Sequence, residues 1–221
     1  MNTKGIVAIG VLLLAMLACS AVPVASNAVV GSGKVISETR NVSGFTGVRL
    51  AGFGDVDVKI GPAESVVVQA DDNIVPLIET TVSNGKLIIR TNPLTIIRRT
   101  SGIHVSVVAK SVDELTLGGS GNIHAAGMTG PKLVVALPGS GDITVTGKTD
   151  NATIMLLGSG NIYCDGLQAH SVGVQIMGSG NVTAYADQRL DASIFGSGNV
   201  RYSGEPAHVT KDIKGSGTIT P

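Results

Sequence analysis

The tetrapeptide Gly-Ser-Gly-Asn, or a close variant of it, recurs along the second half of this 221-residue chain. The Gly-Ser-Gly starts fall at positions 119, 139, 158, 178, 196 and 215, so the intervals are 20, 19, 20, 18 and 19 residues. Sequence repeats of about 20 to 50 residues are typical of solenoid proteins. A flexible linker needs no such regularity, and a phosphate-binding loop needs one glycine-rich copy followed by a helix.

The segments on both sides of each turn alternate between apolar and polar residues, as in "NIHAAG", "DITVTG" and "NIYCDG". This period of two predicts strands with one buried face, and no helical pattern separates them. The chain is also 43% hydrophobic, which excludes a disordered Gly/Ser segment. We therefore predict an all-β fold, a right-handed parallel β-helix with coils of about 20 residues and GSG[ND] corners, in which equivalent side chains stack into ladders.

The repeated turn is interpreted as the corner of each coil. Glycine accepts a positive φ at low cost and Asn or Asp tolerates it, so these residues suit a tight bend. Stacked corners would align the serines and would also align an Asn/Asp ladder, whose members are Asn122, Asp142, Asn161, Asn181 and Asn199. In the first half, "GSGK" from Gly31 and "GFGD" from Gly52 resemble the same corner, and "SNGK" from Ser83 predicts a hairpin. "ADDNIVPLIETTV" predicts a connecting segment with one helical turn, and its Asp71 and Asp72 indicate a solvated turn.

The first residues are typical of an export signal. Lys4 precedes an apolar run from Ile6 to Leu17, which is shorter than the roughly 20 residues that span a bilayer. "MLAC" ending at Cys19 favours a lipoprotein signal, with Cys19 as the lipidated residue; cleavage after Ala28 is the alternative. The predicted organisation is a signal peptide over residues 1–18, a tether with a first strand over 19–44, and a β-helix domain over 45–221.

Nothing in the sequence predicts catalysis, a cofactor or a metal site. The formal charge is zero, without a basic run, so nucleic acid is not an expected partner. The four histidines are scattered, with His124 predicted to face solvent, and Cys164 falls at an inward position, which favours a buried apolar role. Carboxylates such as Asp55, Asp57 and Asp142 show no acid–base pairing.

The residue directly before each corner points outward by strand parity. Stacked coils would turn these residues into an apolar stripe, and its members are Pro138, Leu157, Met177 and Phe195. Two explanations stay open: a loop or the N-terminal segment covers the stripe, or the stripe is a contact surface for a partner or a second copy.

Several blocks of the sequence, in order, resemble a family of bacterial envelope proteins. The blocks are "FTGVRLAGFGDVDVKIG", "SVVVQADDNIVPLIETTVSNGKLIIRT", "SVDELTLGGSGNI" and the later corners, and they cover roughly Phe45 to Pro221. The family is the putative auto-transporter adhesin "head GIN" domain, once catalogued as a domain of unknown function. The resemblance implies a β-helix-like fold outside the cytoplasm and brings no catalytic residues.

The expected function is therefore that of an exported cell-envelope protein that binds without catalysis. Its expected partners are the membrane, through a lipid anchor at Cys19, and an unidentified glycan or envelope protein. Two alternatives remain: a glycan-degrading enzyme of the polysaccharide lyase or hydrolase type, and a periplasmic assembly or stress factor. The enzyme would need a lateral groove with clustered carboxylates.

Overall fold

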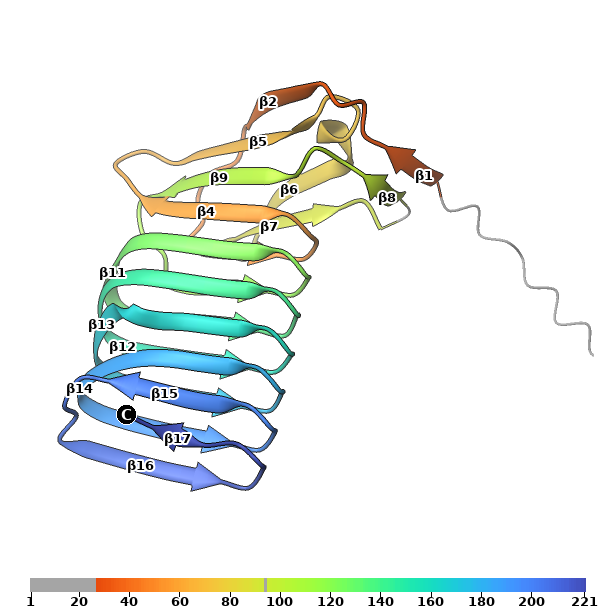
Figure 1. Cartoon of the computed structure of the whole chain (residues 1–221). Coiled ribbons are helices and arrows are strands. Elements are labelled where there is room, and N and C mark those ends of the chain that lie inside the picture. Colours follow the sequence, from red (N-terminus) through yellow and green to blue (C-terminus); the bar gives the residue numbers. More distant parts are fainter. Residues whose placement is uncertain (1–26, 94) are drawn as a thin grey trace, which may run out of the picture.

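The chain forms a parallel β-solenoid of about 5 turns, as predicted (Figure 1). The computed structural model describes residues 27–93 and 95–221. A 3-10 helix, η1, covers Val75–Leu77. The strands are Asn27–Val30 (β1), Val35–Arg40 (β2), Gly47–Leu50 (β3), Asp55–Ile60 (β4), Ser65–Asp71 (β5), Ile78–Ser83 (β6), Lys86–Thr91 (β7), Thr95–Arg99 (β8), His104–Ala109 (β9), Glu114–Leu117 (β10), Asn122–Leu137 (β11), Asp142–Leu156 (β12), Asn161–Ile176 (β13), Asn181–Ile194 (β14), Asn199–Ser203 (β15), His208–Ile213 (β16) and Ile219–Thr220 (β17).

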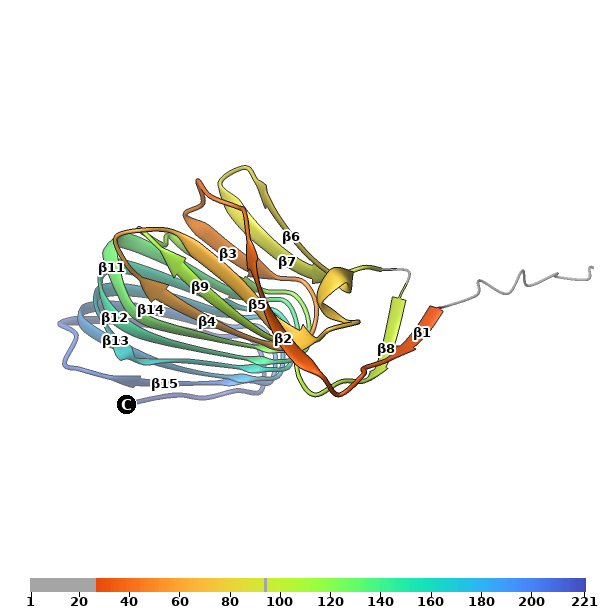
Figure 2. The same ribbon diagram turned by 90° about the horizontal axis from the view of Figure 1, so that it is seen from above.

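The solenoid has two walls, and each of the long strands β11 to β14 runs along one wall, bends and returns along the other. Seen along the stack, the coils form a flattened ring (Figure 2). The first halves of these strands pair in parallel and continue into β4 and β9 at one end and β15 and β17 at the other. The second halves continue into β10, β3 and β7, and at the far end into β16.

The core is a set of aliphatic ladders between the two walls. On the first wall Ile123, Ile143 and Ile162 are register partners and fully buried. Leu137 and Leu156 stack in the same way on the opposite wall. Burying one such side chain contributes about 1.5–3 kcal/mol, so each coil gains its core mainly by stacking on its neighbours.

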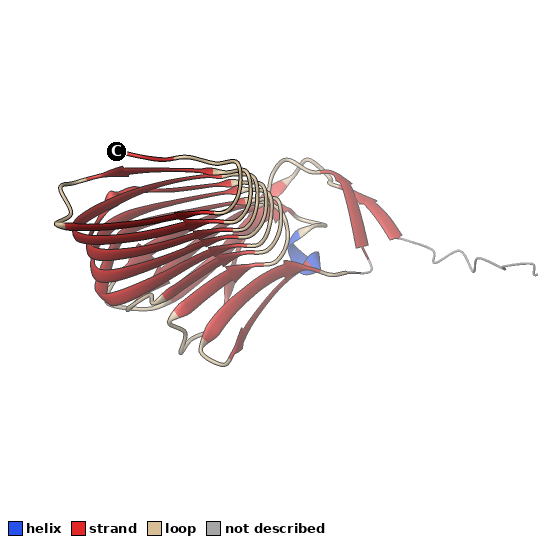
Figure 3. Cartoon of the chain, turned by 90° about the horizontal axis from the view of Figure 1, so that it is seen from below, coloured by secondary structure: helices blue, strands red, loops and turns tan. Residues whose placement is uncertain are grey.

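The Gly-Ser-Gly corners stack as predicted, but the reason for glycine differs from the expected one. Figure 3 shows the corners as a column of loops along one edge. None of the glycines in the six corners has a positive φ. Instead the backbones approach so closely that a Cβ on Gly139 would overlap the carbonyl oxygen of Gly119. Backbone hydrogen bonds from the serines join successive corners: Ser140 N donates to Gly119 O over 2.9 Å, and Ser159 N donates to Gly139 O over 3.2 Å.

Beside the corners the predicted Asn/Asp ladder is present and hydrogen-bonded. Asp142 Oδ1 accepts from the backbone N–H of Asn161 over 2.9 Å and from its side-chain amide over 3.0 Å. Asn161 Oδ1 accepts both corresponding groups of Asn181, each over 3.1 Å. The ladder therefore satisfies backbone donors where each strand begins after its corner.

The first half of the chain closes the N-terminal end of the stack. "GFGD" joins the corner column, because Ser120 N donates to Gly52 O over 3.1 Å. "SNGK" forms the predicted hairpin between β6 and β7, with Asn84 and Gly85 at positive φ. The predicted helical turn is η1. "GSGK" is not a corner: Gly33 N donates to Asp71 Oδ1 over 2.9 Å, away from the column.

Asp71 differs from its prediction as part of a solvated turn, because it is fully buried. It accepts hydrogen bonds from the hydroxyl of Thr100 over 2.6 Å and from the backbone N–H of Ser101 over 2.8 Å, besides that of Gly33. These bonds, the one from Thr100 first, lower the pKa of Asp71 to about 2. Asp71 thus ties the N-terminal segment to the loop before β9.

Candidate functional site

The apolar stripe lies along the corner edge and is open to solvent. Leu157, Met177 and Phe195 are 47%, 52% and 43% exposed, and Pro138 is also exposed. Successive members are held at the coil spacing, since Met177 N donates to Leu156 O over 2.8 Å and Phe195 N to Ile176 O over 2.8 Å. Within residues 27–93 and 95–221, then, no loop buries the stripe, although its role as a contact surface stays a prediction.

A lysine side chain lies at the C-terminal end of the stripe. Lys214 occupies the equivalent position in the last coil, and its Nζ lies 5.0 Å from the centre of the Phe195 ring. Such a cation–π contact contributes about 0.5–1 kcal/mol at an exposed site. The stripe therefore has a polar end at the last coil and an apolar middle at Leu157 and Met177.

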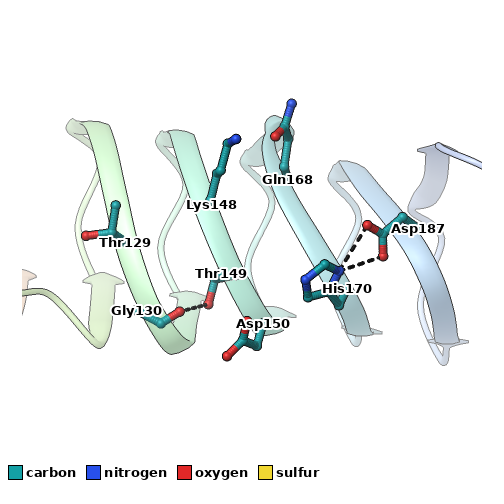
Figure 4. Close-up of a pocket in the computed structure, with 8 residues that line it drawn as sticks. All are labelled: Thr129, Gly130, Lys148, Thr149, Asp150, Gln168, His170 and Asp187. Carbon is teal, nitrogen blue, oxygen red and sulfur yellow. Dashed lines mark hydrogen bonds and ion pairs between the residues drawn. The ribbon is translucent and has the colours of Figure 1, made fainter.

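The opposite edge of the solenoid, where the long strands bend, carries a pocket of about 550 Å³ that we call the bend pocket (Figure 4). Unlike the corners, the bends share no sequence: Gly127, Gly130 and Gly147 have positive φ in two coils, whereas the bend of β14 reads "ADQR". Side chains can therefore differ from coil to coil here. The pocket is lined by Thr129, Gly130, Lys148, Thr149, Asp150, Gln168, His170 and Asp187.

Two rows of residues build the bend pocket. Register partnership places Thr129, Lys148 and Gln168 side by side in one row, and Figure 4 shows the last two projecting in the same direction. In the second row His170 Nδ1 lies 2.9 Å from Asp187 Oδ1. Hydrogen bonding to Asp187, and then the charges of Asp187 and Asp150, raise the pKa of His170.

The other candidate residues lie on the first wall or in the core, outside the bend pocket. His104 Nε2 lies 3.2 Å from Asp57 Oδ2, His124 faces solvent as predicted, and Asp55 accepts a hydrogen bond from Asn122 over 2.7 Å. Among the described residues, no group of three or more His, Cys, Asp or Glu side chains could hold a metal ion. Cys164 is buried as predicted, and burial raises the pKa of its thiol.

The bend pocket was missed by reasoning from the sequence, although a signal for it exists. Thr129, Lys148 and Gln168 are separated by 19 and 20 residues, which is the coil period. Repeated letters mark the coil period at the corners, whereas these three positions hold three different residue types. Cys19 and the predicted export signal lie outside the described residues. In the part of the chain that the structure covers, no helix has the length and apolar character needed to cross a membrane.

Several solved structures share this fold. A putative adhesin from Bacteroides fragilis has a TM-score of 0.73 and 23% identity, over 87% of this chain and 99% of that one. A putative adhesin from Parabacteroides merdae has a TM-score of 0.56 and 21% identity, over 88% and 98%. A protein from Parabacteroides distasonis named as a putative lipid binding protein has a TM-score of 0.52 and 25% identity, over 88% and 99%.

A search of curated proteins found no match. A family model, by contrast, matches residues 44–206, which is more than half of the chain and contains β3 to β15 with all but one of the Gly-Ser-Gly corners of the repeat. The chain therefore belongs to the family described as "Putative auto-transporter adhesin, head GIN domain".

Proposed function

We propose that this protein is an exported, adhesin-like binding protein of the cell envelope that acts without catalysis and is anchored through lipidated Cys19. The observation that carries the proposal is the exposed apolar stripe along the corner edge of the stack. An adhesin must present a fixed surface to a partner, and a hydrogen-bonded stack holds Leu157, Met177 and Phe195 at constant spacing. The names of the solved relatives, which include adhesins, support the same function.

The partner of the stripe, in this proposal, is another protein. Contiguous exposed apolar side chains on a soluble domain mark interaction sites, and protein interfaces are enriched in Met and aromatic residues. The Ser column beside the stripe, with Ser140, Ser159 and Ser179 exposed, provides a polar rim. A polar rim around an apolar centre is the usual composition of a protein interface.

The experiment compares attachment of the purified mature protein to bacterial envelope preparations before and after Leu157→Ser/Met177→Ser. We expect attachment to fall at least tenfold with an unchanged melting temperature, because both side chains are already exposed. Ile96→Ser is the matched control, since Ile96 is equally exposed (49%) but lies on β8, away from the stripe. Loss of melting temperature without loss of attachment would contradict the proposal.

The anchor and the two alternative functions need separate tests. Metabolic labelling with a lipid probe should mark the wild type but not Cys19→Ser, and proteolysis of intact cells should cut a surface-exposed protein. Protection from protease, with co-purification of periplasmic folding or stress proteins, would favour the assembly factor instead.

For the glycan-degrading enzyme, the bend pocket supplies Asp150 and Asp187, but Asp187 is paired with His170. In the part of the chain that the structure describes, every carboxyl group with a shifted pKa, such as Glu114 or Asp191, has a lowered pKa, whereas a general acid requires a raised one.

A further inference from the structure

The bend pocket contains polar side chains without protein partners. Lys148, Asp150 and Gln168 line it and are exposed, and their side chains make no hydrogen bond or ion pair with another residue of the described chain. In a smaller pocket of about 300 Å³, by contrast, the carboxylate of Asp165 is already hydrogen-bonded to Thr183 over 2.7 Å. The side-chain donors and acceptors of Lys148, Asp150 and Gln168 are thus free for a ligand that replaces their water.

The charges of the pocket point to a ligand without net charge. The charge of Lys148 is balanced by that of Asp150, and Asp187 is hydrogen-bonded to His170, whose raised pKa favours the protonated imidazole. A polyanion such as nucleic acid would meet two carboxylates, and a polycation would meet the ammonium group. The lining also includes no Val, Leu, Ile, Met, Phe or Tyr side chain, so the specificity of the pocket must come from its polar groups.

The shape of the pocket suits a short extended chain that lies along the solenoid axis. Its residues come from four successive coils, β11 to β14, and three strand spacings of about 4.8 Å give roughly 14 Å. The volume of about 550 Å³ falls in the usual range for small-ligand sites. A peptide is a poorer match, because peptides typically add to a sheet edge or insert apolar side chains into pockets. The bend pocket lies over the bends of internal strands and offers neither.

We propose that the bend pocket binds a neutral oligosaccharide, with Lys148, Asp150 and Gln168 hydrogen-bonding to sugar hydroxyl groups. A hydroxyl group both donates and accepts. Lys148 offers only donors, Asp150 only acceptors, and Gln168 both, so adjacent hydroxyl groups can satisfy all three. The ion pair holds His170 against Asp187 at the far side of the pocket and leaves the other ring nitrogen for the ligand. This site is separate from the stripe and goes beyond the proposed attachment to a protein.

The test is a printed array of neutral oligosaccharides of two to four hexose or N-acetylhexosamine units, with uronic-acid oligosaccharides and tetrapeptides as comparison spots. The full mature protein should bind neutral glycans, and Lys148→Ala/Asp150→Ala should weaken that binding at least tenfold. Asp150→Asn, which keeps an acceptor, should weaken it less. The matched control is Lys132→Ala/Glu205→Ala, which removes one cation and one anion from exposed positions outside the pocket.

Three results would overturn the glycan site: no binding to any neutral glycan, binding only to uronic acids or peptides, or equal binding by the pocket variant and the wild type. All the variants should unfold at the wild-type temperature, because the substituted side chains are exposed. The stripe variant Leu157→Ser/Met177→Ser should keep its glycan binding. Failure of the glycan site and failure of the attachment function are therefore seen separately, each in its own variant.

Discussion

At the scale of single residues, the corner glycines are needed for space and not for backbone conformation. Gly178→Ala would place a Cβ against the carbonyl oxygen of Gly158, and backbone cannot move aside as a side chain does. We expect a loss of about 2–3 kcal/mol in the free energy of unfolding, as for other overpacked sites, measured by urea denaturation.

Gly173→Ala is the matched control for this substitution. Gly173 lies in β13 of the same coil, but a Cβ there has no atom within 4 Å. This change should be neutral or stabilising by about 0.5 kcal/mol, because alanine reduces the freedom of the unfolded chain. Equal losses at Gly173 and Gly178 would show that strand propensity, and not the close approach of corners, explains the repeated glycines.

Asp71 should make the stability of the protein sensitive to acid. Its folded pKa of about 2 lies below the ordinary 3.8, so its stabilising effect is complete above pH 4 and is lost as the pH falls towards 2. Asp71→Asn removes that effect, because an amide nitrogen cannot accept the bonds from Thr100 and Ser101. The melting temperatures of variant and wild type should therefore differ most at neutral pH and converge near pH 2.

Thermal melting between pH 2 and pH 7 checks this prediction, with Glu205→Gln as the control. Glu205 is exposed and its side chain has no hydrogen-bond partner in the described chain, so its substitution should leave the pH profile unchanged. A constant difference between Asp71→Asn and wild type at all these pH values would mean that lost packing, and not the lost carboxylate, causes the effect.

At the scale of elements, the Asn/Asp ladder stabilises the start of each strand on the first wall. Asn161→Ala removes an acceptor from the backbone N–H and side chain of Asn181 and a donor to Asp142. We expect a loss of about 1–2 kcal/mol, measured by urea denaturation, because each net hydrogen bond contributes about 1 kcal/mol. Ser159→Ala should stay within about 0.5 kcal/mol, since only the backbone N–H of this exposed serine is needed. A larger loss at Ser159 than at Asn161 would assign the stabilising role to the serine column.

The contrast between the two edges explains what could be predicted from the sequence. At the corners, close stacking restricts two positions to glycine, so the repeated Gly-Ser-Gly revealed the coils and, beside them, the ladder and the stripe. The bends accept many residues, from the glycines at 127 and 147 to "ADQR" in β14, and no motif marks the bend pocket. The burial of Asp71 was also hidden, because its partners Gly33 and Ser101 lie about 30 residues or more away in the chain.

At the scale of the whole molecule, the two ends of the stack differ. At the N-terminal end, β2 and β5 pair antiparallel, and Asp71 and Asn73 hold the segment before β2. At the C-terminal end, the described chain pairs β16 with β14 alone. Val209 and Ile213, which continue the aliphatic ladders of the core, are 40% and 45% exposed there. In a solenoid each coil is stabilised mainly by its neighbours, so a coil with one neighbour is the least stable.

Native-state hydrogen exchange should therefore show a gradient along the stack. Amides of β12 and β13, which have a paired coil on both sides, should exchange only through global unfolding, whereas those of β16 and β17 should exchange through local opening. Low urea should accelerate exchange in β12 and β13 strongly and in β16 hardly at all, because local opening exposes little surface. The stripe and the bend pocket both centre on β12 and β13, so this gradient places the two proposed binding surfaces on the most rigid coils. Uniform protection from β11 to β17 would instead mean that the stack opens as a single unit. In that case β12 and β13 would be no more rigid than the other coils, and rigidity would not explain why both proposed binding surfaces lie there.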